Sequence, residues 1–135
     1  MEKKVIVFAQ DNCIKGKGEP AGRIPVPVGS TLTITCSDTD EWEIRTGDER
    51  FEVNANGKRG DMPYNPGPEH ATMFYGTLVG SFDGGTTYFS VGTHLVMTVN
   101  YASPDGGDPI LTLWCWDSYS EDNSGAISAT VLIEP

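Results

Sequence analysis

The fold of this chain is decided between residues 110 and 133, where two apolar stretches flank a polar one. The first stretch reads Ile110-Leu-Thr-Leu-Trp-Cys-Trp116, and the second runs from Ala126 to Ile133. Between them lies Asp117-Ser-Tyr-Ser-Glu-Asp-Asn-Ser-Gly125, which is rich in residues typical of turns. We therefore expect two β-strands here, joined by a polar loop that is held by a strand at each end.

The rest of the chain repeats this pattern of short strands separated by turns. Apolar and polar residues alternate in several windows, and none keeps an apolar period of about 3.6 residues, so strands are expected rather than helices. The clearest alternation is Thr31-Leu-Thr-Ile-Thr-Cys36, and further strands are expected over residues 5–9, 51–53, 74–82, 87–91 and 94–101. Because its prolines cannot donate backbone hydrogen bonds, the stretch 23–28 is expected to be either an edge strand or an extended segment leading into a strand. We predict an all-β fold with residues 1–135 as one domain, a small antiparallel β-sandwich of the jelly-roll or galactose-binding-domain type.

Glycine and charge interrupt these strands in recognisable places. Gly76 and Gly80 lie inside the stretch 74–82 and indicate bulges or close approach of another part of the chain. Asp83-Gly-Gly85 is a strong signal for a hairpin turn. Residues 11–22 are expected to form a loop that packs against nothing. Residues 54–71 are the longest irregular stretch, either a surface loop or a binding loop.

The composition limits the possible partners. The 135 residues carry a formal net charge of −10, from 9 Lys and Arg against 19 Asp and Glu. This argues against nucleic acid and anionic membrane surfaces, because both would be repelled, and it is compatible with cation binding. The opening Met-Glu-Lys-Lys and the apolar run after it are too short for a signal peptide or a membrane span. We expect a cytoplasmic protein, or one exported without a conventional signal peptide, with no transmembrane segment.

The three cysteines, Cys13, Cys36 and Cys115, show no spacing typical of zinc sites. Cys36 and Cys115 stand on the apolar sides of expected strands, where a free cysteine behaves as a small hydrophobic residue. We predict that all three are reduced and not catalytic, with Cys36 and Cys115 in the core.

Oxygen-bearing side chains are concentrated directly after Trp116. Asp117, Glu121, Asp122 and Asn123 fall within seven residues on a loop held between two strands. Calcium binds about six to eight oxygen ligands and accepts carboxylates, amide carbonyls and backbone carbonyls together. These residues therefore indicate a Ca²⁺ site. An ordinary hairpin turn explains the same composition equally well.

Several motifs together resemble the LecA-like calcium-dependent galactophilic lectins of pseudomonads. Gly76-Thr-Leu-Val-Gly-Ser-Phe-Asp-Gly-Gly85, followed by Val91-Gly92, resembles a hairpin of these lectins. Leu111-Thr-Leu-Trp-Cys-Trp-Asp117 and Asp122-Asn-Ser-Gly125 resemble the stretch before their last strand. Val28-Gly-Ser-Thr-Leu-Thr-Ile34 is similar to an earlier strand. The resemblance covers most of the chain in order, and its specific part is the C-terminal sixty or so residues.

This resemblance implies a small β-sandwich that binds one calcium ion, with two galactose hydroxyls completing the coordination. It implies that Asp117, Asp122 and Asn123 are calcium ligands and that Trp42 contributes its backbone carbonyl. Asp117 and Asp122 would also contact the sugar. Glu121 has no counterpart, because this loop is two residues shorter; it either replaces a missing backbone carbonyl or remains in solvent.

The chain also departs from these lectins at the expected sugar site. Trp116 stands where they have Asn. The loop that reads the sugar corresponds here to residues 61–75, which offer Tyr64 and His70 without a matching spacing. His70 is either a ligand contact or an incidental surface residue. The ring of Tyr119, Trp116, Trp42 or Tyr64 could stack on the apolar face of a sugar, and each Trp could instead be packed in the core.

We therefore predict a calcium-dependent carbohydrate-binding domain, not an enzyme, with a galactoside-like ligand. The alternative is a non-catalytic structural or assembly domain, possibly a homo-oligomer, that keeps the fold but binds no sugar. In that case another subunit could cover the flat face formed by Ile110, Thr112, Trp114 and Trp116. A hydrolase is a weaker alternative, because the common catalytic motifs are missing and only the Asp117 and Glu121 pair resembles a glycosidase site.

Overall fold

The computed structural model describes residues 1–46, 48–58, 63–66 and 72–135. These residues form an antiparallel β-sandwich and contain no helix, so the predicted fold class is confirmed. The ten strands are β1 (Glu2–Phe8), β2 (Ala21–Pro25), β3 (Thr31–Cys36), β4 (Trp42–Thr46), β5 (Glu49–Val53), β6 (Leu78–Ser81), β7 (Phe89–Ser90), β8 (His94–Thr98), β9 (Ile110–Cys115) and β10 (Ser124–Glu134). The described residues therefore include no helix that could cross a membrane.

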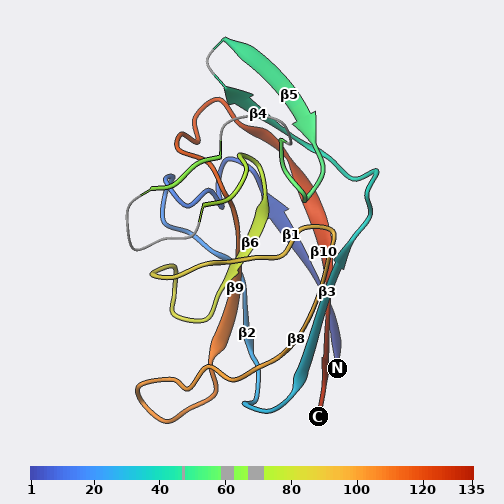
Figure 1. Ribbon diagram of the computed structural model, residues 1–135, viewed down its shortest axis with the longest axis vertical. Helices are drawn as coiled ribbons and strands as arrows, with labels where there is room; N and C mark the ends of the chain where they lie inside the picture. Colours follow the sequence, from blue (N-terminus) through green and yellow to red (C-terminus); the bar gives the residue numbers. More distant parts are fainter. Residues whose placement is uncertain (47, 59–62, 67–71) are drawn as a thin grey trace.

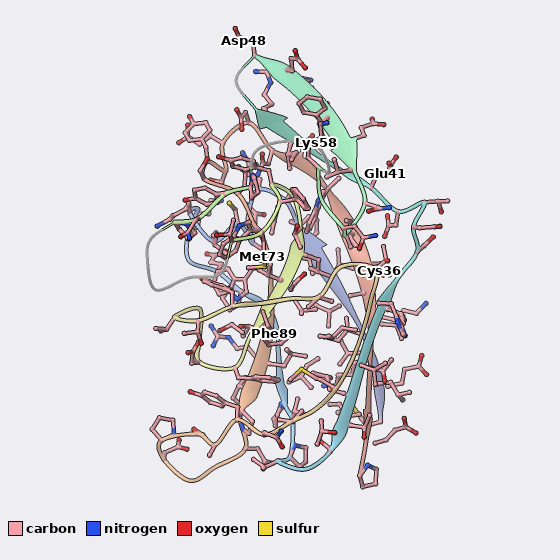
Figure 2. The ribbon with its side chains drawn as sticks, viewed as in Figure 1. Cys36, Glu41, Asp48, Lys58, Met73 and Phe89 are labelled. Carbon is pink, nitrogen blue, oxygen red and sulfur yellow. The ribbon has the colours of Figure 1, made fainter. Side chains whose placement is uncertain are left out.

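Two sheets form the layers of the sandwich. The larger sheet has the order β5-β4-β10-β3-β8, and β1 pairs with β10 as well. The smaller sheet has the order β2-β9-β6-β7. Figure 1 shows β2, β9 and β6 beside β1, β10 and β3, with the β4–β5 hairpin at one end and both termini at the other. Asp48 marks the tip of that hairpin (Figure 2).

The core lies between the sheets and follows from the alternation of the strands. Leu32 and Ile34 of β3 are buried, and the threonines between them are partly exposed. On β10 the buried residues are Ile127, Ala129, Val131 and Ile133, and on β9 they are Leu111, Leu113 and Cys115. Full burial of such a side chain is worth roughly 1.5–3 kcal/mol, so the alternating residues hold the two sheets together.

The other face of β9 is covered by loops of the same chain. Trp114 and Trp116 form a second apolar cluster with Met73 and Val79, against which Ile14, Tyr64 and Tyr88 pack. Thr112 is 2% exposed and Trp116 is fully buried. The expectation that a second subunit would cover this face is therefore corrected, because loops near residues 14, 64 and 88 already do so.

Several strand boundaries differ from the expected ones. The stretch 74–82 yields only β6, because Gly76 has a φ of 81° and its backbone lies against the side chains of Val53 and Ile44. Gly80 faces the ring of Phe89, and a Cβ atom there would lie 2.5 Å from that ring. Close approach is thus the reason for both glycines. The strand β4 was not expected at all.

The cysteines are free. Cys115 is buried as expected, and so is Cys13. Cys36 lies at the end of β3 and is only partly buried, so its placement in the core needs correction (Figure 2).

Candidate metal and ligand site

The loop between β9 and β10 contains two buried polar side chains with incomplete hydrogen bonding. Asp117 is 1% exposed and its Oδ1 accepts the backbone N–H of Ser118 at 2.7 Å. Asn123 is 4% exposed and its Nδ2 donates to the carbonyl of Ala9 at 3.1 Å. Among the described residues, neither Asp117 Oδ2 nor Asn123 Oδ1 has a hydrogen-bond partner. A buried acceptor without a hydrogen bond lowers the free energy of unfolding by about 1–3 kcal/mol. Both oxygens therefore favour a hydrogen-bond donor or a cation as a partner.

Asn123 and Asp122 both affect the pKa of the Asp117 carboxyl. The pKa of the Asp117 carboxyl is raised from 3.8 to about 6, mainly by burial. The Asn123 side chain and the backbone N–H groups of Ser118 and Tyr119 lower it, and the negative charge of Asp122 raises it. The backbone N–H of Asn123 donates to the carbonyl of Ser120 at 3.0 Å, which closes the turn that returns the chain to Asp117. Asp117 and Asn123 are thus both buried in this loop, and the charge of Asp122 acts on the Asp117 carboxyl.

Glu121 and Tyr119 lie on the exposed side of the same loop. The Tyr119 hydroxyl donates to Glu121 Oε2 at 2.8 Å. The backbone carbonyl of Glu121 accepts from Gln10 Nε2 at 3.0 Å. Both side chains are exposed, and the Glu121 carboxylate already has a partner. The role of Glu121 as a metal ligand stays a prediction, and the ring of Tyr119 is exposed on the same loop.

Trp42 reaches the loop through its backbone. It lies opposite Gly125 in the pairing of β4 with β10. A Cβ atom on Gly125 would lie 3.3 Å from the Trp42 Cα, so the two backbones are in close contact. The indole is 1% exposed and its Nε1 donates to the carbonyl of Gly76 at 2.9 Å. Trp42 therefore lies opposite Gly125, the residue that follows Asn123 by two positions, and its backbone carbonyl is the one that the lectin resemblance implies as a ligand. Its ring is too buried to stack on a sugar.

The aromatic residues divide into buried and partly exposed rings. Trp116 is fully buried and its Nε1 donates to the carbonyl of Tyr64 at 3.0 Å, so no part of its ring is available to a ligand. Tyr64 is half-buried and stacks on Tyr75 with ring centroids 5.2 Å apart. The pKa of Tyr64 is raised by burial and also by the charge of Asp117, which places Tyr64 near the site. His70 lies outside the described residues.

The N-terminal segment that supports this loop was not expected from the sequence. Ala9 bonds to the Asn123 side chain through its carbonyl and to the Gly125 carbonyl through its N–H. The Cys13 thiol donates to the Asp117 carbonyl at 3.5 Å. Asn12 and Cys13 are buried, so the expectation that residues 11–22 pack against nothing is corrected. Asn12 and Cys13 belong to no periodic pattern, and long-range contacts with Cys115, Asp117 and Asn123 bring the segment here.

The donor set suits one class of cation. No group of three or more His, Cys, Asp or Glu side chains in the described part of the chain is placed to hold a metal ion. The available donors are instead two carboxylates, one amide oxygen and nearby backbone carbonyls. Burial raises the pKa of the Cys13 thiol to about 11, so this neighbour stays protonated and does not act as a thiolate ligand. Oxygen donors alone fit a hard cation such as Ca²⁺.

Comparison with known proteins gave no match: no family model, no curated protein and no solved structure was found to match the chain. The resemblance to galactophilic lectins therefore rests on the motifs quoted from the sequence.

Proposed function

We propose that this protein is a calcium-dependent carbohydrate-binding domain with a galactose-type ligand. The observation that carries the proposal is the pair of buried oxygens without partners, Asp117 Oδ2 and Asn123 Oδ1. They belong to two residues of one loop, and both residues had been expected to bind calcium. The Asp117 carboxylate is buried with a donor on Oδ1 but none on Oδ2, which carries a free-energy cost that a bound cation would offset.

Asp117, Asp122, Asn123 and the backbone carbonyl of Trp42 would hold the ion. Calcium would supply coordination positions at which two neighbouring sugar hydroxyls replace water. Asp117 is fixed directly after β9 and Asn123 directly before β10, so two strands of different sheets hold the ligands. A site held by strands keeps its geometry better than a free acidic loop does. The choice of galactose comes from the lectin resemblance.

Isothermal titration with methyl galactoside tests the proposal. We expect binding in the presence of calcium, and loss of that binding when a chelator removes the ion. Asp117→Asn should abolish binding even with calcium, because the amide lacks the charge that holds the ion. Wild-type protein that binds no glycan on a broad array with calcium present would contradict the proposal.

A second candidate function is an assembly domain that binds no sugar. It is favoured by exposed apolar residues on the outward face of the larger sheet, where Ile6 is 57%, Phe8 47% and Val96 55% exposed. Ile6 and Phe8 lie on β1 and Val96 lies on β8, at the two sides of β10 and β3, and exposed apolar residues of this kind favour contact with another protein surface. Homo-oligomerisation and the lack of an enzymatic activity stay predictions.

A further inference from the structure

Tyr119 and Glu121 form one structural unit at the surface of the proposed site. The Tyr119 ring is 53% exposed, and its hydroxyl is held by Glu121 Oε2 at 2.8 Å. This hydrogen bond favours one orientation of the exposed ring. The pair belongs to the loop that carries Asp117 and Asp122: the backbone N–H of Tyr119 lowers the pKa of Asp117, and the charge of Asp122 acts on the Tyr119 hydroxyl.

The backbone of the same loop is held from three sides. Ser118 N–H donates to Asp117 Oδ1, and the Asn123 N–H donates to the Ser120 carbonyl. The Glu121 carbonyl accepts from Gln10 of the N-terminal segment. A Cβ atom on Gly16 would lie 3.2 Å from the Ser120 side chain, so that segment also packs against the loop. Tyr119 and Glu121 are therefore positioned by the fold rather than by a flexible turn.

The charges of the loop differ in how they are neutralised. Asp117 is buried and Asp122 is half-buried beside it, and the two charges of a calcium ion would match these two carboxylates. Glu121 is exposed and receives only a neutral hydroxyl, so its charge remains at the surface. The packed N-terminal segment carries two exposed lysines: Lys17 pairs with Asp11 at 3.3 Å, and neither Lys15 nor Lys17 forms an ion pair with Glu121 among the described residues. A ligand that approaches Tyr119 thus meets an aromatic face and an uncompensated negative charge.

We infer that the Tyr119–Glu121 pair is a selectivity element, in which the ring contacts the apolar face of the sugar and the carboxylate excludes acidic sugars. This inference rests on the proposed function. It assigns the ligand to neutral sugars and excludes uronic and sialic acids. Aromatic contact with a sugar is favourable because the C–H face is apolar, and repulsion between like charges is strong close to a protein surface.

Two probes that differ by one carboxylate test this selectivity: methyl galactoside and methyl galacturonoside, titrated with calcium at low salt. We expect wild-type protein to bind the neutral sugar at least about tenfold more tightly, which corresponds to about 1.4 kcal/mol. Glu121→Gln should reduce this preference to roughly threefold or less. Tyr119→Ala should weaken binding of the neutral sugar by roughly tenfold, and Tyr119→Phe by less because the ring remains. Glu134→Gln, at an exposed position at the end of β10, is the matched control and should keep the wild-type preference.

The calcium-induced rise in melting temperature, measured on the same variants, separates the possible failures. If Glu121→Gln loses this rise, Glu121 holds the ion and the inference is overturned. If the rise persists but the preference in Glu121→Gln or the affinity in Tyr119→Ala equals that of wild type, the inference is wrong and the proposed function stands. Wild-type protein with neither a calcium response nor sugar binding overturns both.

Discussion

At the scale of single residues, the balance of energies around Asp117 decides what the loop does. Its carboxyl is buried, one oxygen has no partner in the described part of the chain, and its pKa is raised to about 6. At neutral pH the side chain is therefore charged at a cost to the calcium-free protein. A bound cation requires the same negative charge. Asp117 therefore destabilises the calcium-free folded protein and favours the binding of calcium.

The first prediction concerns the substitution Asp117→Asn. It removes the buried charge and keeps the shape, so we expect the calcium-free protein to become more stable at pH 7.5 by roughly 1–3 kcal/mol. The rise in melting temperature with calcium should disappear. In wild type that rise should be roughly 5–10 °C, because a ligand at a hundredfold excess over Kd stabilises by about 2.7 kcal/mol.

Differential scanning calorimetry with calcium or chelator measures both effects. Asp108→Asn is the control, because Asp108 is an exposed carboxylate in another loop. A wild-type melting temperature that ignores both calcium and chelator would show that this loop binds no such ion.

The second prediction is the pH dependence of the calcium-free protein. The Asp117 pKa is about 6 in the folded state and near 3.8 in the unfolded state, so the folded state binds the proton more tightly between these values. The free energy of unfolding should therefore fall as pH rises from about 4 to about 6, by up to roughly 3 kcal/mol at about 1.4 kcal/mol per pKa unit.

Urea unfolding of wild type and Asp117→Asn at pH 4, 5, 6 and 7, all in chelator, isolates this contribution as the difference between the two curves. With calcium the sign reverses, because the ion needs the deprotonated form, and its stabilising effect should weaken below about pH 6. A difference between the two proteins that stays constant over this range would rule out the raised pKa.

The sequence could predict the donors of the site because they are close neighbours in the chain. Asp117, Asp122 and Asn123 share one loop, and a turn brings them together. It could not predict that Trp116 is buried or that Glu121 bonds to Tyr119. Trp116 is covered by Tyr64, more than fifty residues earlier in the chain, and alternation along a strand does not reveal what covers its outer face.

At the scale of elements, the turn after β6 is held together by hydrogen bonds to a single side chain, that of Asp83. Asp83 accepts hydrogen bonds from the Ser81 hydroxyl, the Thr86 and Thr87 N–H groups and the Thr87 hydroxyl. Burial alone would raise the pKa of Asp83, but the hydrogen bonds from Thr87, Ser81 and Thr86 outweigh it and lower the pKa. Gly84 and Gly85 adopt positive φ, as the expected turn requires.

The third prediction is that Asp83→Ala destabilises the protein by about 1–3 kcal/mol, because several donors lose their acceptor. Asp83→Asn should cost less, since one acceptor oxygen remains. Chemical denaturation provides the measurement, and Asp108→Ala serves as the exposed comparison. If Asp83→Ala unfolds at the wild-type denaturant concentration, the turn is held by its glycines alone.

Elements with strong local alternation were predictable, and those that depend on distant partners were not. The stretch Thr31–Cys36 matches the bounds of β3, because its residues alternate between buried and partly exposed as far as Thr35; only Cys36 is less buried than the pattern predicts. The strand β4 was missed since Trp42–Thr46 mixes charge with apolar residues, and it is a strand through pairing with β5 and with Gly125 of β10. Residues 74–77 were wrongly assigned to a strand because the conformation of Gly76 follows from contacts with β4 and β5.

At the scale of the whole molecule, charge and apolar surface are unevenly distributed. The chain carries a net charge of −10. On the outward face of the larger sheet, however, the central strand β3 presents only Thr31, Thr33 and Thr35, beside Val96 of β8 and with Ile6 exposed on β1. Glu2 and Lys4 of β1 and Glu134 of β10 are charged residues on this face. Two copies of an acidic protein repel each other, and a face whose central strand carries no charge reduces that repulsion where the copies meet.

The last prediction is that this face mediates weak self-association, which rises with salt because salt screens the repulsion between the acidic molecules. Ile6→Lys and Val96→Lys, each on this face, should shift the protein to monomer, since association would bury the new charge without a partner. Ala102→Lys adds the same charge to an exposed loop outside the face and should associate like wild type. Sedimentation velocity over a range of protein concentrations and at two salt concentrations measures the effect. Association that Ile6→Lys leaves intact would place the contact elsewhere, and a wild-type monomer at every concentration would remove the support for an assembly role.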